Sequence, residues 1–263
     1  EGRIHSVCDI SHEFTFYMDG RFFTQYIGAE NGADARNWGT LHKLDLGDAN
    51  LLVLSSGPGP VAYAPENVAH VRKFVEEGGV ALILADCPQG EPPYPLQIQT
   101  LAKAFGATFS PRPAEKPLQA IEALEAKNVE FYGGGVLDLQ EGWKPLVTDR
   151  GGRPTMASRR LGKGYVVAAS RGLFGHRPDA KDPINAAWIT PMLKRLVRNR
   201  PVDPARPPKG QSAELSHKLG ELTVEYNEGT KVFADAIAAE YAVVKKQLEQ
   251  IAGVPPSKGT LTH

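Results

Sequence analysis

The stretch Asn50–Asp86, NLLVLSSGPGPVAYAPENVAHVRKFVEEGGVALILAD, decides the fold. Leu51–Leu54 is an unbroken apolar run, and Val80–Ala85 is a second one. Between them, Pro65 opens a helix that ends at Gly78-Gly79. Two strands without polar alternation, joined by a helix, indicate a βαβ unit of a parallel sheet that is buried on both faces. The connection between the strands should be right-handed.

The remaining elements extend this unit in both directions. We expect a first strand at 4–10, an aromatic-rich helix at 14–27, a loop at 28–39 and a short strand at 41–46. After a Pro-rich segment, the pattern predicts a helix at 96–105, a strand at 107–110, a helix within 111–128 and a glycine-interrupted strand at 129–139. It then predicts a strand pair around Val147 and Met156 and a buried strand at 165–169. The last predicted element is a helix at 184–198, with a kink or a new first turn at Pro191. The aromatic residues Phe14 to Tyr26 are expected in the core or at a domain interface, and a carbohydrate or peptide platform is the alternative. The fold class is therefore α/β, a doubly wound, flavodoxin-like and mostly parallel sheet with a C-terminal strand-helix appendage.

Composition divides the chain further and excludes some partners. Residues 1–200 are expected to form the α/β domain, 201–212 a Pro-rich linker, and 213–263 a strand at 221–226 with a long helix at 230–251. Lys plus Arg and Asp plus Glu both number 30, and no basic stripe is present, which argues against nucleic acid. No apolar run approaches the roughly 20 residues of a membrane-spanning helix.

The helix predicted at 230–251 has an apolar stripe that must be buried against another surface. We expect it to contact another domain or another subunit, so that an oligomerisation role is one reading of the tail. The chain begins with Glu1 rather than Met, which fits an extracellular or periplasmic protein whose signal has been removed, although a trimmed chain looks the same. Cys8 and Cys87 could be free or paired, because spacing alone does not place them within bonding distance.

Several of these features together resemble class I glutamine amidotransferase-like domains. They are Asp9-Ile10-Ser11-His12 after the first strand, the run Leu51–Leu54, the helix end Phe74–Gly79, and Gly162-Lys163-Gly164 before a late strand. The resemblance covers about residues 4–200 and is closer to the non-catalytic relatives, which precede other domains in secreted or membrane-associated bacterial proteins. The tail is similar to the opening strand and helix of gluzincin-type metallopeptidase domains. Their H-E-x-x-H motif is absent from this sequence, so we expect no cofactor here, and zinc only in a further C-terminal domain.

The amidotransferase resemblance implies a Cys-His-acid triad, for which Cys87, His176 and Asp179 are the candidates. The nucleophile elbow of such enzymes draws an oxyanion-hole donor from the backbone N–H of the residue after the nucleophile. Pro88 follows Cys87 and has no N–H, and Asp86 opposes formation of a thiolate by like-charge repulsion. The alternative is that Cys87 is a small residue at the end of a strand.

A second group of candidates follows the first and third predicted strands. His12 and Glu13 leave one strand, and Ser55 and Ser56 leave the other, at the edge that lines the ligand crevice in open α/β sheets. We therefore expect these four residues to bind a ligand. The alternatives are that His12 forms a hydrogen bond with a neighbouring loop and that Ser55 and Ser56 belong to a rigid turn between a strand and a helix. Same-face residues four apart on a strand lie ~13 Å apart, too far to share a metal ion. His12 and Glu13 could bind a metal only together with another segment, and no second cluster of ligands is visible, so no metal site is predicted.

These observations favour a non-catalytic amidotransferase-like accessory domain of a secreted bacterial protein, of which a metallopeptidase is one example. Its role would be substrate binding or assembly, with a peptide or a glycan as the bound molecule. The alternative is a Cys-dependent hydrolase or amidotransferase that uses Cys87 and His176. The sequence does not identify the ligand or the oligomeric state.

Overall fold

The computed structural model describes residues 3–8, 22–23, 26–27, 34–38, 41, 44–55, 63–85, 96–126, 128–175, 182–202, 215–219, 222–226, 235, 241 and 259–262. The chain divides into two compact units, one made of residues 1–39 and 46–207 and the other of residues 40–45 and 208–263. The domain boundaries expected from the sequence stay a prediction.

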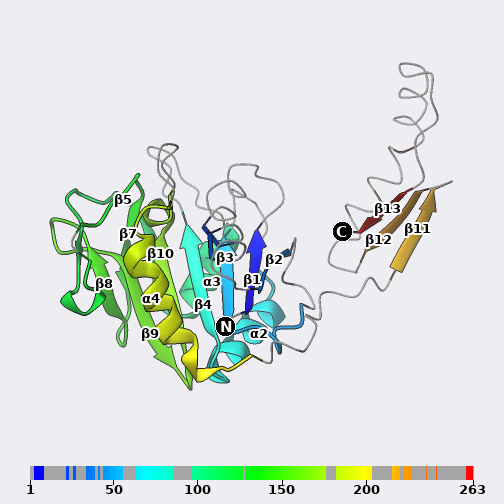
Figure 1. Ribbon diagram of the computed structural model, residues 1–263, viewed down its shortest axis with the longest axis horizontal. Coiled ribbons are helices and arrows are strands. Elements are labelled where there is room, and N and C mark those ends of the chain that lie inside the picture. The colour runs from blue at the N-terminus through cyan, green and yellow to red at the C-terminus, as the bar shows by residue number, and fades with distance from the viewer. Residues whose placement is uncertain are drawn as a thin grey trace, which may run out of the picture. The chain divides into compact units, whose positions relative to one another are not determined.

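The first unit contains an eight-stranded sheet in the order β2-β1-β3-β4-β10-β9-β8-β6 (Figure 1). Its parallel half consists of β1 (Arg3–Cys8), β2 (Asp34–Trp38), β3 (Leu51–Ser55), β4 (Val80–Ala85) and β10 (Gly164–Ser170). Counted along the chain, these five strands have the order 2-1-3-4-5, which is that of flavodoxin-like folds. The α/β, mostly parallel architecture expected from the sequence is therefore confirmed.

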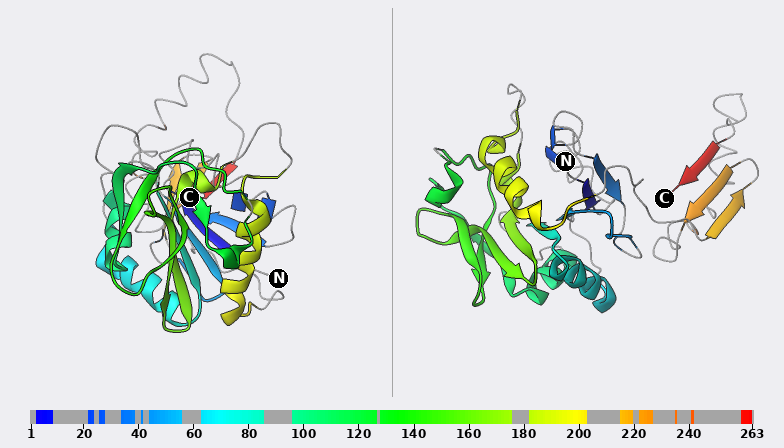
Figure 2. Two further views of the ribbon diagram at one scale, coloured as in Figure 1. Left: turned by 90° about the vertical axis from the view of Figure 1, so that its left-hand side faces the viewer. Right: turned by 60° about the horizontal axis from the view of Figure 1, so that its bottom comes forward.

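The parallel half is buried because its strands carry apolar residues on both faces. On one face, the core contains Leu51 and Leu82 together with Trp188 and Met192 of α4 (Ala186–Leu196). The opposite face is covered by α2 (Pro65–Glu76) and α3 (Leu96–Ala104), which contact β4. Figure 2 shows α4 on the other side of the sheet from these two helices. The two strands and the helix predicted for 50–86 are present as β3, α2 and β4, whereas residues 56–62 between β3 and α2 lie outside the described residues.

The antiparallel half continues the sheet beyond β10. It consists of β9 (Pro154–Leu161), β8 (Lys144–Thr148) and the two-residue β6 (Gln119–Ala120). A separate two-stranded sheet pairs β5 (Ala107–Pro113) with β7 (Gly135–Leu139), and β7 contacts β9. The predicted strand pair around Val147 and Met156 is the β8–β9 pair.

Three local expectations were wrong. The second strand is Asp34–Trp38, inside the expected loop, and the expected strand at 41–46 is not formed by the residues described there. An edge strand is held by its backbone pairing to one neighbour, so this polar segment needs no apolar run. The 111–128 segment forms the end of β5, β6 and the short helix η2 (Glu122–Leu124) instead of a regular helix, in keeping with prolines at 111, 113 and 117. Finally, α4 contains Pro191 in its interior, so the expected alternative of a new first turn at this residue was wrong, whereas the kink stays a prediction.

The second unit contains a three-stranded sheet. Its central strand β12 (Leu222–Tyr226) confirms the strand expected at 221–226 and pairs antiparallel with β11 (Leu215–Leu219) and parallel with β13 (Gly259–Thr262). Of the helix expected at 230–251, the structure describes Asp235 and Tyr241 alone, so that prediction lies mostly outside the described residues. Among the described helices, none has the length and apolar character needed to cross a membrane.

Candidate functional site

The carboxyl ends of the parallel strands lie level at one edge of the sheet. Cys8 at the end of β1 is paired in register with Ser55 at the end of β3, and Ala85 of β4 is paired with Ser170 of β10. The chain turns outward in opposite directions from β1 and β3, since β2 lies on one side and β4 on the other. This is the topological switch point, where ligands bind in open α/β sheets.

The structure places one of the four predicted ligand-binding residues. Ser55 is the last residue of β3 and is fully buried, so its side chain is packed inside the protein at the carboxyl edge of the sheet. His12, Glu13 and Ser56 lie outside the described residues. Their expected role stays a prediction. The structure does place the strands that precede them, because β1 and β3 are neighbours and end at the same level.

The three residues of the alternative triad, Cys87, His176 and Asp179, also lie outside the described residues. The structure does describe the strand and the helix on either side of Cys87. β4 ends at Ala85, two residues before Cys87, and the next described helix, α3, begins at Leu96. In a nucleophile elbow the reactive residue stands in a sharp turn between a strand and a helix. Here the described strand and helix are separated by residues 86–95.

The segment that follows β10 is packed very closely against a glycine pair. The short helix η3 (Arg171–Leu173) follows directly from Ser170. Gly172 accepts a hydrogen bond of 3.1 Å from the backbone N–H of Tyr132, and a side chain at Gly172 would collide with the carbonyl oxygen of Gly133. A side chain at Gly134 would collide with the hydroxyl of Ser170. Glycine is therefore required for the close approach of these two segments.

Asn185, the residue before α4, forms hydrogen bonds with the segments that contain Glu130 and Leu173. Its Nδ2 donates to the carbonyl oxygens of Glu130 at 2.8 Å and Leu173 at 2.9 Å. Its Oδ1 accepts from the backbone N–H of Glu130 at 3.0 Å and from Nε1 of Trp188 at 3.1 Å. The backbone of Asn185 has a φ of 61°, which asparagine tolerates better than most residues. One side chain thus ties together the chain before β7, the end of β10 and the start of α4.

Sequence reasoning did not identify Ser170, Arg171 or Asn185. Ser170 and Arg171 are 1% and 4% exposed, at the carboxyl edge of the sheet. The Oγ atom of Ser170 has no hydrogen-bond partner among the described residues. The signal for the first two was present, since polar residues directly follow the apolar run Tyr165–Ala169. Asn185 carried no such signal, because its partners come from segments far away in the sequence.

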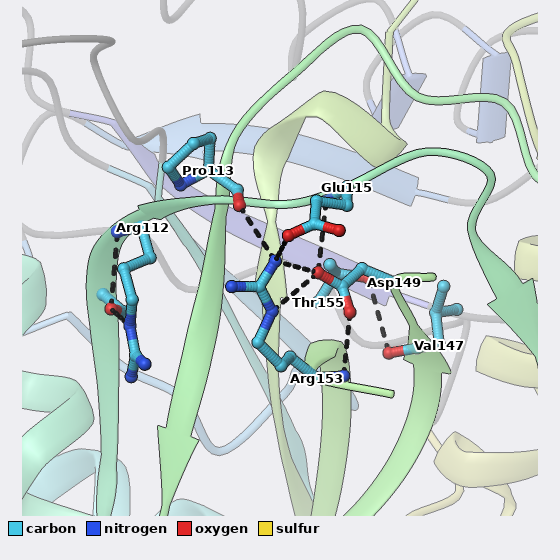
Figure 3. Close-up of polar contacts among 8 residues, drawn as sticks. Arg112, Pro113, Glu115, Val147, Asp149, Arg153 and Thr155 are labelled. Carbon is cyan, nitrogen blue, oxygen red and sulfur yellow. Dashed lines mark hydrogen bonds and ion pairs between the residues drawn. The ribbon is translucent and has the colours of Figure 1, made fainter. Parts of the chain in front are cut away.

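A charged cluster of Asp149, Arg153 and Glu115 lies at the β8–β9 turn (Figure 3). The carboxylate of Asp149 is buried and accepts from Nε and Nη2 of Arg153, at 2.9 and 2.6 Å. It also accepts from the backbone N–H groups of Arg153 at 2.8 Å and of Glu115 at 3.1 Å. The Nη2 atom of Arg153 reaches Glu115 Oε1 at 2.9 Å as well.

The electrostatics of this cluster are those of a structural ion pair. Burial alone would raise the pKa of Asp149, but the hydrogen bonds from Arg153 and from two backbone N–H groups, with the charge of Arg153, hold that pKa below its ordinary value. The pKa of Arg153 is raised, first by its hydrogen bond to Asp149. A carboxylate with so many donors is a poor proton acceptor, so the cluster is suited to fixing the β8–β9 turn rather than to catalysis.

A cleft of about 490 Å³ adjoins this cluster, between β7 and the β8–β9 pair, and both Arg112 and Arg153 line it. Arg112 is bound to Asp138 at 2.9 Å, and Arg153 is bound to Asp149 and Glu115, so both cations are already compensated. Across the residues that the structure describes, no group of His, Cys, Asp and Glu side chains is arranged to hold a metal ion.

Comparisons with known proteins give the fold but not a family. No family model matches the chain, and no curated protein matches it in sequence. Among solved structures, the chain is similar to the mmIFT52 N-terminal domain, with 13% identity and a TM-score of 0.54 over 74% of this chain and 97% of that one. It is also similar to the cytoplasmic protein STM3548 from Salmonella typhimurium, with 11% identity and a TM-score of 0.50 over 73% and 98% of the two chains.

A third similar structure has a lower score. A Thermoplasma acidophilum protein that bears the name of a GMP synthase is 13% identical, with a TM-score of 0.41 over 75% of this chain and 94% of that one. A score of this size supports no statement about family, fold relationship or activity. The similarities thus support an α/β fold of this size and leave the function to the residues themselves.

Proposed function

We propose that the first unit is a non-catalytic, amidotransferase-like module that acts in substrate binding or assembly. The observation that carries the proposal is the five-strand parallel order with its switch point between β1 and β3, combined with a cysteine that Pro88 follows. In open α/β sheets a ligand crevice lies at such a switch point. Proline lacks the backbone N–H that the elbow of a catalytic relative contributes to its oxyanion hole.

The ligand crevice of this module would be formed by the loops after β1 and β3, with His12, Glu13 and Ser56 as its polar groups above the buried Ser55. A peptide or a glycan is the class of molecule that such a set of hydroxyl, imidazole and carboxylate groups binds through hydrogen bonds. Placement in a secreted bacterial protein, with the tail beginning a metallopeptidase domain, belongs to the same proposal and rests on the resemblance of the tail.

The first test is hydrolysis by the full chain. Purified protein is incubated with glutamine and with an activated ester, beside the Cys87→Ala variant. We expect no turnover above the buffer rate and no difference between the two proteins, because removal of one oxyanion-hole donor alone costs about 10²- to 10³-fold in rate. Turnover that Cys87→Ala abolishes while the circular dichroism spectrum is unchanged would overturn the proposal in favour of the Cys-dependent hydrolase.

A second measurement addresses the crevice. Binding of peptide and glycan arrays is compared between the full chain and the double variant His12→Ala with Glu13→Ala. We expect at least one array component whose binding the double variant removes. Identical binding profiles for the two proteins would show that the loop after β1 takes no part in ligand binding.

A further inference from the structure

A groove lies between the outer face of α4 and the chain around η2, on the first unit. Its volume is about 600 Å³. The buried side chains of Leu124 and Trp188 contribute to its lining, and Nη2 of Arg195 donates to the carbonyl oxygen of Ala123 at 3.2 Å, which joins the two walls. We call this feature the α4 groove. None of its residues is among those predicted to bind a ligand at the carboxyl edge of the sheet.

The two ends of the α4 groove differ in chemistry. Ala187 and Pro191, both exposed, line the part beside the first half of α4, whereas Lys194, Arg195 and Arg198 line the part beside its end. At ~1.5 Å per helical residue, the distance from Ala187 to Arg195 is ~12 Å, the length of about four residues of extended peptide. An apolar side chain followed by acidic ones would match this order.

The charge of the groove is strongly one-sided. Its described lining has three cations, Lys194, Arg195 and Arg198, and one acid, Glu125. Among the described residues, neither Lys194 nor Arg198 has an ion-pair partner. The helix dipole favours cations in the last turn of α4, which accounts for Lys194 and Arg195. It does not account for Arg198, which lies beyond α4 in the short helix η4 (Val197–Asn199), nor for the apolar half beside the cations.

A further exposed apolar residue stands at the start of the wall opposite α4. Ile121 is 40% exposed and immediately precedes η2, whose Ala123 and Leu124 line the groove. Ile121 is not itself part of the lining, so the choice of occupant rests on the groove residues. The apolar part of the groove beside Ala187 and Pro191 suits an apolar side chain of a peptide better than a small inorganic anion.

We propose that the α4 groove binds an acidic peptide segment of a partner protein, with one apolar side chain beside Ala187 and Pro191 and carboxylates facing Lys194 and Arg198. The attraction between carboxylates and these cations fixes the direction of the peptide, and burial of the apolar side chain adds affinity that charge alone does not give. The inference is independent of the proposed function, since it holds whether or not Cys87 is catalytic.

The test is fluorescence anisotropy with the full chain and three labelled hexapeptides. The first is acidic and contains one leucine, the second has that leucine replaced by serine, and the third has its acidic residues replaced by lysine. A single-stranded oligonucleotide of matching negative charge is the fourth probe. We expect the first peptide to bind at least about fivefold more tightly than each of the other probes, with affinity that falls as salt rises.

Two variants locate the binding. Lys194→Glu combined with Arg198→Glu should weaken the acidic peptide about tenfold, whereas the matched control Lys116→Glu combined with Lys144→Glu, with the same change in charge at exposed positions elsewhere, should leave it unchanged. Ala187→Arg should weaken binding although it adds a positive charge, because it fills the apolar half. Equal weakening by both charge reversals, stronger binding by Ala187→Arg, tighter binding of the oligonucleotide, or no peptide binding would each overturn the proposal.

Discussion

In β4, at the centre of the parallel half, all six residues from Val80 to Ala85 are buried, whereas in β8, in the antiparallel half, only Leu146 and Val147 are. β4 is covered by helices on both faces and is held by apolar contacts. The turn after β8 is held by Asp149 and its four hydrogen bonds. The comparison teaches that one sheet can combine a half specified by hydrophobic burial with a half specified by a polar cluster.

The largest effect should follow from a cavity in the parallel half. Leu82 is fully buried at the middle of β4. Leu82→Ala removes apolar contacts and leaves a void, so we expect the free energy of unfolding to fall by about 3–4 kcal/mol, measured by urea denaturation at pH 7. The control Ile121→Ala, at a residue that is 40% exposed, should change it by less than about 0.5 kcal/mol. A loss below about 1 kcal/mol for Leu82→Ala would mean that the parallel half is not the stabilising core.

The same difference decides what could be predicted from the sequence. The parallel strands β3, β4 and β10 follow from apolar runs of the right length, because a strand buried on both faces leaves no room for polar alternation. β2 did not follow, since an edge strand such as Asp34–Trp38 is defined by its backbone pairing with β1 and not by its composition. In the 111–128 segment, Leu118, Ile121 and Leu124 have helical spacing, but the prolines at 111, 113 and 117 oppose a regular helix.

The edge of the sheet proposed for ligand binding was predictable, but only part of its residues can be placed. The carboxyl edge of β3 and β4 follows from the βαβ pattern, and Ser55 lies at that edge, whereas ligand binding there stays a prediction. Asn185 could not be found, because its role depends on segments 12 and 55 residues away along the chain. The α4 groove could not be predicted from the sequence either. Its two walls are α4 and the chain around η2, and no sequence pattern links these two segments.

An intermediate effect should follow from removing the charge of Asp149. Asp149→Asn keeps the shape of the side chain but removes the acceptor of the charge-assisted bonds from Arg153, so we expect the free energy of unfolding to fall by about 2 kcal/mol at pH 7. The measurement is again urea denaturation. A change as large as that of Leu82→Ala would remove the distinction between the two halves.

The matched control is the other arginine-bound aspartate of this region. Asp138 binds Arg112 at 2.9 Å, but both side chains are more than half exposed, at 55% and 60%. Asp138→Asn should lower the free energy of unfolding by no more than about 0.5 kcal/mol, because exposed ion pairs contribute little in water. The two substitutions make the same chemical change, so a difference between them measures the environment of Asp149. Equal effects would show that burial of the Asp149 carboxylate is unimportant.

The smallest effect concerns pH, and its sign follows from the lowered pKa of Asp149. Its value in the folded protein lies below the ordinary 3.8, so the unfolded chain binds the proton more readily than the folded one. The stabilisation by the ionised carboxylate is therefore complete above the unfolded pKa and disappears as the pH falls through the folded pKa. We expect the difference in free energy of unfolding between the wild type and Asp149→Asn to be constant from pH 7 to about 5 and to shrink below about 4. Urea denaturation of both proteins across this range checks it. A difference that grows on acidification would mean that the folded state binds the proton more tightly, and that the burial of Asp149 outweighs its four donors.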